Sequence, residues 1–337
     1  MKKPAIVILI WIQAGLLFAQ LDNSFKFLNI PAGARVASLG GSAISSTDYD
    51  VNLFISNPAL LDSADDNHVS LSYMGFYADV KYSSLAYAKT FKKAGTFGLG
   101  IQHLGYGSID SYDPSGVAIG SFNANETAVV ISHSHQVSVF KMGINLKFIN
   151  SNIYTYSSSA FAMDIGGVFR HPEKEFMVSV LFKNLGFVLS DFTASSESSL
   201  PTDLQIGITF KPEHMPFRFT FTGHNLFNPN QVYNAQLFDA NEKAAGIGDK
   251  IFSHLNIGTE ILFSRNFNIR LGYNHQVRNE LKLSEKSGLS GISMGLMFRI
   301  KAFELAYTLT TYHVDSGRSY FTITSNLNKV FKKKSII

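Results

Sequence analysis

Charged residues recur in this sequence within stretches where polar and apolar residues alternate. Nine of them are Lys147, Asp164, Lys183, Asp203, Arg218, Glu260, Arg270, Arg299 and Glu304. Successive side chains of a β-strand point to opposite faces, so each of these charges lies on the polar face of its segment. Charges enclosed by a fold must be paired or hydrated. The mixed signs therefore predict buried ion pairs, and they argue against an open pore lined by one sign of charge.

The residue types used by enzymes and metal sites are present, but their spacing selects no known set. His133 and His135 share one face of a predicted strand, and no third metal ligand is identifiable. The glycines between 98 and 107 do not follow a strand-to-helix turn, which a phosphate-binding loop requires. Cysteine is absent, and no spacing indicates a Ser–His–Asp triad. We expect no catalytic residue, no metal and no cofactor; a hydrolase built on a barrel is the enzymatic alternative.

The elements that must position these charges are β-strands. In residues 217–222 every second residue is phenylalanine, and Arg or Thr stands between. A strand with lipid on one face and a polar interior on the other alternates in this way. We predict fourteen antiparallel strands at 68–78, 80–91, 94–108, 119–135, 141–153, 157–171, 174–186, 200–212, 216–226, 252–264, 266–278, 289–300, 301–313 and 318–327.

The connections between these strands alternate between short and long for most of the chain. The long ones are predicted at 109–118, 187–199, 227–251 and 279–288. Outer-membrane barrels have short periplasmic turns and long extracellular loops. The pattern therefore predicts an all-β transmembrane barrel of about fourteen strands with both chain ends in the periplasm. A soluble barrel or sandwich is the alternative, although nothing in such a fold requires short and long connections to alternate.

The N-terminus has the features of a secretory signal peptide. Lys2 and Lys3 precede an apolar run over 5–18, and Ala19 and Gln20 follow it. The run is shorter than the roughly 20 residues of a membrane-spanning helix. We predict that residues 1–20 are removed on export and that the protein resides in the outer membrane of a Gram-negative bacterium. The dispersed net charge of +4 predicts no nucleic-acid partner.

Residues 21–66 lack the alternation and are predicted to form a plug inside the barrel, which spans 67–331 and is followed by a basic tail at 332–337. Asn57 and Pro58 indicate a helix start, because Asn caps exposed N–H groups and Pro suits the first helical position. Arg35 is the plug charge expected to pair with the lumen, and its candidate partners are Asp164, Asp203, Glu260 and Glu304. A periplasmic tail is the alternative for this segment.

The longest predicted loop, 227–251, is the candidate partner surface. It contains Phe227, Tyr233, Leu237 and Phe238. Exposed aromatic and aliphatic side chains on a polar loop are typical of interface cores. The same residues are also typical of a loop that folds on itself, so both interpretations stand.

The plug segment carries a resemblance to a known family. Residues 27–41 contain Arg35, Gly40 and Gly41; Asp48-Tyr49-Asp50-Val51-Asn52 and Asn57-Pro58-Ala59-Leu60-Leu61 follow. This segment resembles the PorQ/PorV group of outer-membrane proteins of the type IX secretion system, most of all its PorQ-like members. That group is similar to the FadL-type channels for hydrophobic solutes, which are fourteen-stranded barrels with an N-terminal hatch. Here Phe331 is followed by 332–337, whereas outer-membrane barrels often end on an aromatic residue.

The resemblance implies a non-enzymatic function. PorQ-like proteins are thought to hold a PorZ-like surface protein at the outer membrane, in a complex with a PorU-like sortase and a PorV-like shuttle. The expected function is therefore to anchor this attachment complex. The alternative is a FadL-like channel that passes hydrophobic small molecules, and the shared fold cannot decide between the two.

Overall fold

The computed structural model describes residues 24–76, 78–229, 246–281, 289–313 and 316–331. The predicted signal peptide 1–20, the tail 332–337, most of loop 279–288, and Tyr233, Leu237 and Phe238 lie outside these ranges. None of the helices in the described ranges is long and apolar enough to cross a membrane.

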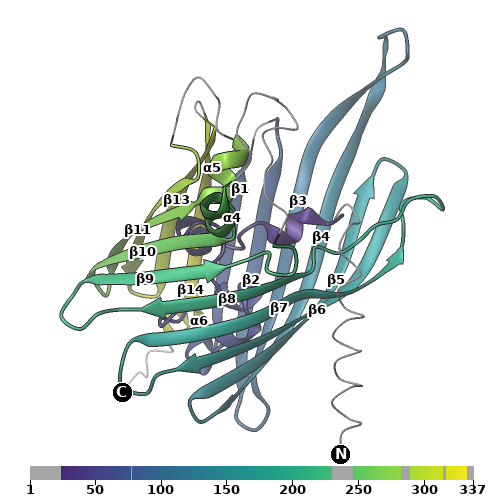
Figure 1. Ribbon diagram of the computed structural model, residues 1–337. Coiled ribbons are helices and arrows are strands. Elements are labelled where there is room, and N and C mark those ends of the chain that lie inside the picture. The colour runs from purple at the N-terminus through teal and green to yellow at the C-terminus, as the bar shows by residue number, and fades with distance from the viewer. Residues whose placement is uncertain (1–23, 77, 230–245, 282–288, 314–315, 332–337) are drawn as a thin grey trace, which may run out of the picture.

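Fourteen antiparallel strands form a closed barrel in which each strand pairs with its neighbours in sequence and β1 pairs with β14 (Figure 1). The strands are β1 His68–Gly75, β2 Lys81–Phe91, β3 Gly95–Tyr112, β4 Ala118–Val137, β5 Phe140–Ile153, β6 Tyr156–Arg170, β7 Phe176–Ser190, β8 Asp203–Phe210, β9 Phe217–Gly223, β10 Leu255–Ser264, β11 Phe267–Asn274, β12 Ile292–Ile300, β13 Phe303–His313 and β14 Ser316–Asn326. The predicted all-β barrel of about fourteen strands is confirmed.

The two faces of the barrel wall differ as the alternation requires. Where β1 meets β14, Ser72 and Thr322 point inward and their hydroxyls are hydrogen-bonded at 2.8 Å. Next to them Leu71 and Ile323 point outward and are 57% and 38% exposed. Large apolar side chains are exposed in this way on strand after strand. A soluble protein rarely shows so extensive an apolar surface, so this outer face is the lipid-facing band of a transmembrane barrel.

The predicted loop at 109–118 is wrong, because β3 and β4 continue through most of it as a hairpin. Ser108 pairs with Asn123 and Tyr112 with Ala118, and the hairpin rises beyond the rest of the barrel (Figure 1). Asp113 closes its turn by accepting hydrogen bonds from the N–H groups of Ser115 and Val117. Beyond the membrane there is no lipid face, so the alternation fades although the strands go on.

Two predicted strand ends are helical instead. Residues 252 and 253 belong to helix α4 (Ile247–Ser253), and residues 275–278 belong to helix α5 (His275–Leu281). In α5 the Asn274 side chain accepts a hydrogen bond from the Val277 N–H, which caps the helix start. Both helices lie at the end of the barrel opposite the short turns, called the long-loop end below (Figure 1). The chain closes with helix α6 (Leu327–Val330) at the short-turn end.

Residues 24–66, called the inner segment, lie inside the barrel. They form five short helical elements: η2 (Lys26–Asn29), α2 (Ala34–Ser38), α3 (Leu53–Ser56), η3 (Pro58–Leu60) and η4 (Ser63–Asp65). Wall side chains from around the barrel donate to the segment's carbonyls: Thr308 to Ala34 at 2.7 Å, Asn145 to Phe54 at 2.9 Å, Ser134 to Leu61 at 2.7 Å and Ser293 to Ser38 at 3.1 Å. Irregular backbone can lie at membrane depth only when such partners satisfy it.

Glycines in the wall let the inner segment approach it closely. A Cβ added at Gly143 would lie 2.3 Å from the Pro58 carbonyl carbon, and one at Gly166 would lie 2.0 Å from Asn57 Oδ1. Asn57 caps η3 by accepting from the Ala59 N–H at 3.0 Å, and its Nδ2 donates to the Ile44 carbonyl. The Asn-Pro-Ala element therefore lies directly against β5 and β6.

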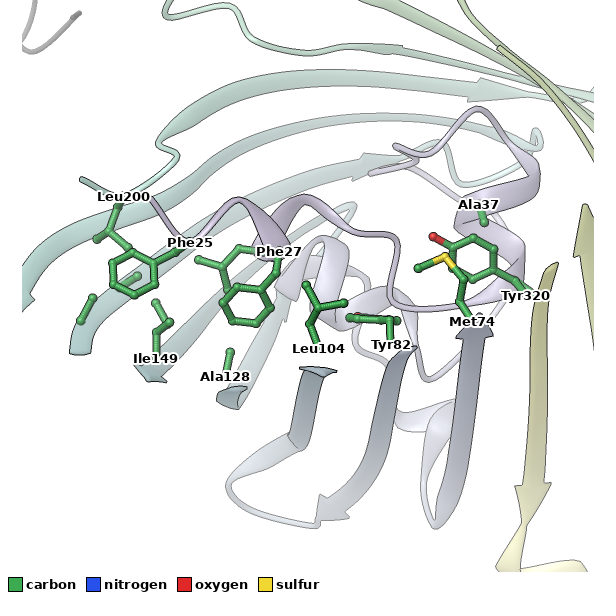
Figure 2. Packing of buried hydrophobic residues seen from close by; sticks show 14 of the residues in the cluster. Phe25, Phe27, Ala37, Met74, Tyr82, Leu104, Ala128, Ile149, Leu200 and Tyr320 are labelled. Atoms are coloured by element: carbon green, nitrogen blue, oxygen red, sulfur yellow. The ribbon is translucent and has the colours of Figure 1, made fainter. Parts of the chain in front are cut away.

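An apolar cluster fills one side of the lumen. Phe25, Phe27 and Leu28 of the inner segment are at most 3% exposed. Figure 2 shows Phe25 and Phe27 above the inward-facing side chains of successive strands, and the cluster includes Met74, Tyr82, Leu104, Ala128, Ile149, Ala160, Ala162 and Tyr320. The inward wall of β2–β6 thus carries an apolar patch near the long-loop end, beside polar inward residues such as Gln102 and Glu126.

Candidate functional site in the barrel lumen

Three adjacent strands bring opposite charges together at the middle of the lumen. Glu260 of β10 is in register with Arg218 of β9 and with Arg270 of β11. Its carboxylate accepts from Arg218 at 3.0 Å and from Arg270 at 3.0 Å. Arg35 reaches the same carboxylate from α2 at 3.1 Å, and all four side chains are at most 5% exposed.

Two further carboxylates complete this group. Arg218 Nη2 lies 3.0 Å from an oxygen of Asp48 and 3.3 Å from one of Glu175. Arg35 is 3.5 Å from Asp48. We call Arg35, Asp48, Arg218, Glu260 and Arg270 the central cluster. Together with Glu175, the cluster has three arginines and three carboxylates. Glu260 and the arginines are buried and need these opposite charges, whereas Asp48 and Glu175 are 45% and 44% exposed and also meet solvent.

A second buried ion pair lies across β5 and β6. Lys147 is 2.7 Å from Asp164, and both side chains are at most 1% exposed. Asn184 joins them: its Oδ1 accepts from Lys147 at 2.8 Å and its N–H donates to Asp164 at 2.8 Å. Asn184 lies at a bulge between β6 and β7 with a φ of 54°. The bulge turns Lys183 and Asn184 inward one after the other, which strict alternation forbids.

The other predicted lumen charges do not join the central cluster. Asp203 accepts from Gln205 at 2.7 Å, and Lys183 donates to Asn29 at 3.0 Å. Arg299 and Glu304 pair with each other at 2.6 Å, and Arg299 is 44% exposed there. Both line a cavity at the short-turn end, so they belong to the mouth of the barrel and not to its buried interior. Of the four predicted partners of Arg35, Glu260 is the one in hydrogen-bond contact with it.

Sequence reasoning missed Asp48 and Glu175 as partners of the lumen arginines. Asp48 lies in an irregular part of the inner segment, and Glu175 lies in a turn just before β7. Neither position has an alternating pattern, so neither could be assigned a face. The excess of arginine over carboxylate among the inward positions of β9–β11 was the one available signal.

Phe227 of the predicted partner loop lies on the outside of the barrel. Its ring centroid is 6.3 Å from that of Phe182, a lipid-facing residue of β7. Its apolar surface therefore extends the outer wall.

Asp65 is a buried carboxyl at the short-turn end of the inner segment. Burial, together with the nearby negative charge of Asp50, raises its pKa to about 8. Its Oδ2 accepts from the Asp62 N–H at 3.2 Å. Asp62 itself contacts Lys141, which together with the Ala64 N–H lowers the Asp62 pKa although burial opposes this. The two carboxyls of this capping box thus differ in charge at neutral pH.

Two cavities lie on either side of the central cluster. One of about 290 Å³ is at the long-loop end and is lined by Gly40, Asn256 and Asn274, among others. One of about 510 Å³ at the short-turn end is lined by Asp48, Arg218 and Leu262. Along β10, Glu260 falls between Asn256 of the first cavity and Leu262 of the second, so the central cluster and α2 separate the two spaces.

The inner segment completes the separation of the two cavities, because its backbone packs closely against β11. Gly40 and Gly41 have φ values of 94° and 91°, in the left-handed region that favours glycine. A Cβ at Gly40 would lie 3.0 Å from the Tyr273 carbonyl oxygen, and one at Gly272 would lie 2.3 Å from Gly40 N. The Gly40 carbonyl accepts from Asn274 Nδ2 at 3.1 Å. The glycine pair therefore brings the segment against β11 beside the long-loop cavity.

Comparison with solved structures shows which barrels the fold is similar to. No family model and no curated protein matches the sequence. The TodX monoaromatic hydrocarbon channel, as a deltaS2 mutant, superposes with a TM-score of 0.53 at 12% identity over 88% of this chain and 97% of that one. A Pseudomonas aeruginosa FadL homologue gives 0.47 at 9% identity over 88% and 98%. At such identities the likeness shows the fold alone, which is that of a FadL-like outer-membrane barrel.

Proposed function

We propose that this protein is an outer-membrane channel for small hydrophobic molecules, held closed by the inner segment. The observation that carries the proposal is the apolar cluster inside the lumen (Figure 2). This apolar patch in an otherwise polar lumen is a surface that an apolar solute could occupy. In the TodX monoaromatic hydrocarbon channel, which has the same fold, the named solute is a small apolar molecule.

Phe25 and Phe27 take the place that an apolar solute would occupy. They pack against the inward-facing Leu104, Ala128 and Ile149. The small Ala side chains of the wall leave room that the two rings fill. Burying apolar surface is favourable by about 25 cal/mol per Å², whether the surface belongs to a phenylalanine ring or to a solute. A solute can therefore replace the rings at little net cost when residues 24–28 move.

The test is uptake of radiolabelled toluene by cells that lack other hydrophobic-solute channels. We expect uptake above that of empty-vector cells, and faster uptake by the double variant Phe25→Ala, Phe27→Ala. The matched control is Phe91→Ala, which removes an exposed ring at the end of β2. Wild-type uptake equal to that of empty-vector cells, with the barrel inserted, would exclude the channel.

The second candidate is the anchor of a type IX attachment complex. The ion-paired lumen favours it, because a structural barrel gains rigidity from charges that a transport path must open. The β3–β4 hairpin also extends beyond the barrel with exposed Tyr112 and Ile119. For this candidate, tagged protein from solubilised outer membranes co-purifies with PorZ-, PorU- and PorV-like subunits, and deletion of 109–118 releases the PorZ-like subunit. Normal partner retention after that deletion would argue against the hairpin as the contact.

A further inference from the structure

The cavity at the long-loop end is lined by polar and apolar residues, and it meets the apolar cluster at Ala37. Six of its lining side chains are carboxamides: Asn29, Gln205, Asn225, Asn256, Asn274 and Gln276. Its volume of about 290 Å³ is at the lower end of the range of ligand pockets, ~300–1,000 Å³. The wall combines the inner segment with β8, β10, β11 and α5, so residues far apart in sequence converge on one space.

The carboxamides retain unused hydrogen-bonding capacity. Gln205 accepts from Ser42 at 3.2 Å and donates to Asp203 at 2.7 Å. Gln276 donates to Glu280 at 2.8 Å and accepts from Asn225 at 3.4 Å. A carboxamide offers two N–H donors and two acceptor lone pairs. These bonds use half of that capacity, so both glutamines still offer a donor and an acceptor.

The wall also contains the buried polar side chains of His224 and Asn256, which are at most 7% exposed. These two side chains interact with each other. They add polar surface to the wall beside the carboxamides.

The cavity wall carries charges of both signs, Lys183 on one side and Asp203 and Glu280 on the other. Lys183 and Asp203 are in register across β7 and β8, and Lys183 donates to Asn29. An ion of either sign would therefore meet like charge as well as opposite charge, so the wall favours an uncharged partner.

We propose that this cavity binds a small, uncharged polyhydroxyl molecule about the size of one sugar ring. A hydroxyl donates and accepts at the same time, which matches a wall whose carboxamides offer both functions. The cavity also has room for about ten water molecules at roughly 30 Å³ each, and a ring with several hydroxyls replaces such a water cluster group by group. This binding uses the carboxamides of the wall and neither Phe25 nor Phe27, although Ala37 belongs to both the apolar cluster and the cavity wall.

The experiment is isothermal titration of the full-length mature protein in detergent with D-glucose, D-galactose and, as a non-sugar probe, glycylglycine. We expect saturable binding of at least one sugar with a millimolar Kd. Gln205→Leu and Gln276→Leu should each weaken it by about tenfold, the effect of one or two lost hydrogen bonds. The matched control is Asn268→Leu, a buried inward-facing amide of the short-turn cavity, which should leave the affinity unchanged. A heat-shifted gel confirms that each variant is a folded barrel.

Three results would overturn the proposal. The first is no saturable heat with either sugar up to tens of millimolar. The second is sugar binding that all three variants weaken equally, which places the site elsewhere. The third is binding of glycylglycine without sugars, which assigns the cavity to amide ligands. Sugar binding without toluene uptake, or the reverse, separates this inference from the proposed channel.

Discussion

At the scale of single residues, Glu260 is the carboxylate at the middle of the central cluster. It is the shared partner of three arginines from three different elements. Glu260→Gln leaves those arginines buried with only Asp48 and Glu175 to compensate them. We expect a loss of about 3–5 kcal/mol, as for removal of one member of a buried ion pair. Urea unfolding in detergent micelles measures it, and a stability equal to wild type would contradict the assigned role.

Arg35→Ala should lower the global stability less than Glu260→Gln does. Its effect should also be more specific to the inner segment. Glu260 keeps Arg218 and Arg270, so we expect a loss of about 1.5–3 kcal/mol, the value of hydrogen bonds to a charged group. The loss falls on the inner segment, because Arg35 joins it to Glu260 of the wall and leaves the contact between Asp48 and Arg218 as its other link within the central cluster. Limited proteolysis should cut residues 24–66 faster than in wild type. Unchanged protection would show that Arg35 does not hold the segment.

Asp65 makes the inner segment sensitive to pH. Its pKa of about 8 in the folded chain exceeds the ordinary value of 3.8, so the folded state binds the proton more tightly than the unfolded state. Stability must then fall as pH rises between these two values. We expect the thermal midpoint to drop between about pH 4 and about pH 8 in wild type and to vary less in Asp65→Asn. An equal pH dependence in the two proteins would contradict the assignment of this effect to Asp65.

At the scale of elements, neighbouring glycines of β6 offer a matched pair. Gly166→Ala would place a methyl against Asn57, which is fixed by its own hydrogen bonds, whereas nothing lies within 4 Å of a Cβ at Gly167. We expect Gly166→Ala to cost ~1–3 kcal/mol, as overpacking does, and to loosen the Asn-Pro-Ala element. Gly167→Ala should be neutral or slightly stabilising. Equal effects of the two changes on proteolysis would show that η3 does not pack on β6.

The sequence predicted elements well wherever one strand face meets lipid. In 217–222 the alternation gave both the strand and the inward position of Arg218. It failed for the β3–β4 hairpin and for α4 and α5, which lie at the long-loop end, where no lipid face imposes a period of two. The inner segment was recognisable by its lack of alternation. Its contacts were not, because they depend on which wall glycine faces which turn, as at Gly143 and Gly166.

At the scale of the whole molecule, the lumen has two chemically different sides. The wall of β2–β6 carries the apolar patch beside the Lys147–Asp164 pair, and the wall of β8–β11 presents amides and charges. The inner segment matches both, with Phe25 and Phe27 on one side and Arg35 on the other. This division allows a solute path and an ion-paired partition to coexist in one barrel.

The closed barrel also accounts for an expected behaviour on gels. Every strand is paired on both sides, so no strand edge is free for detergent to attack. We expect the protein to fractionate with outer membranes and to migrate differently before and after boiling. Recovery in the soluble periplasmic fraction would contradict a lipid-facing outer surface.

Residues 24–66 are expected to shut the lumen of this barrel. Single-channel recording in planar bilayers tests it most directly, with the wild-type protein and a variant that lacks these residues. We predict no steady ionic conductance for the wild type and a stable open conductance for the variant, provided that a heat-shifted gel shows it folded. A wild-type protein that conducts as steadily as the variant would contradict the claim.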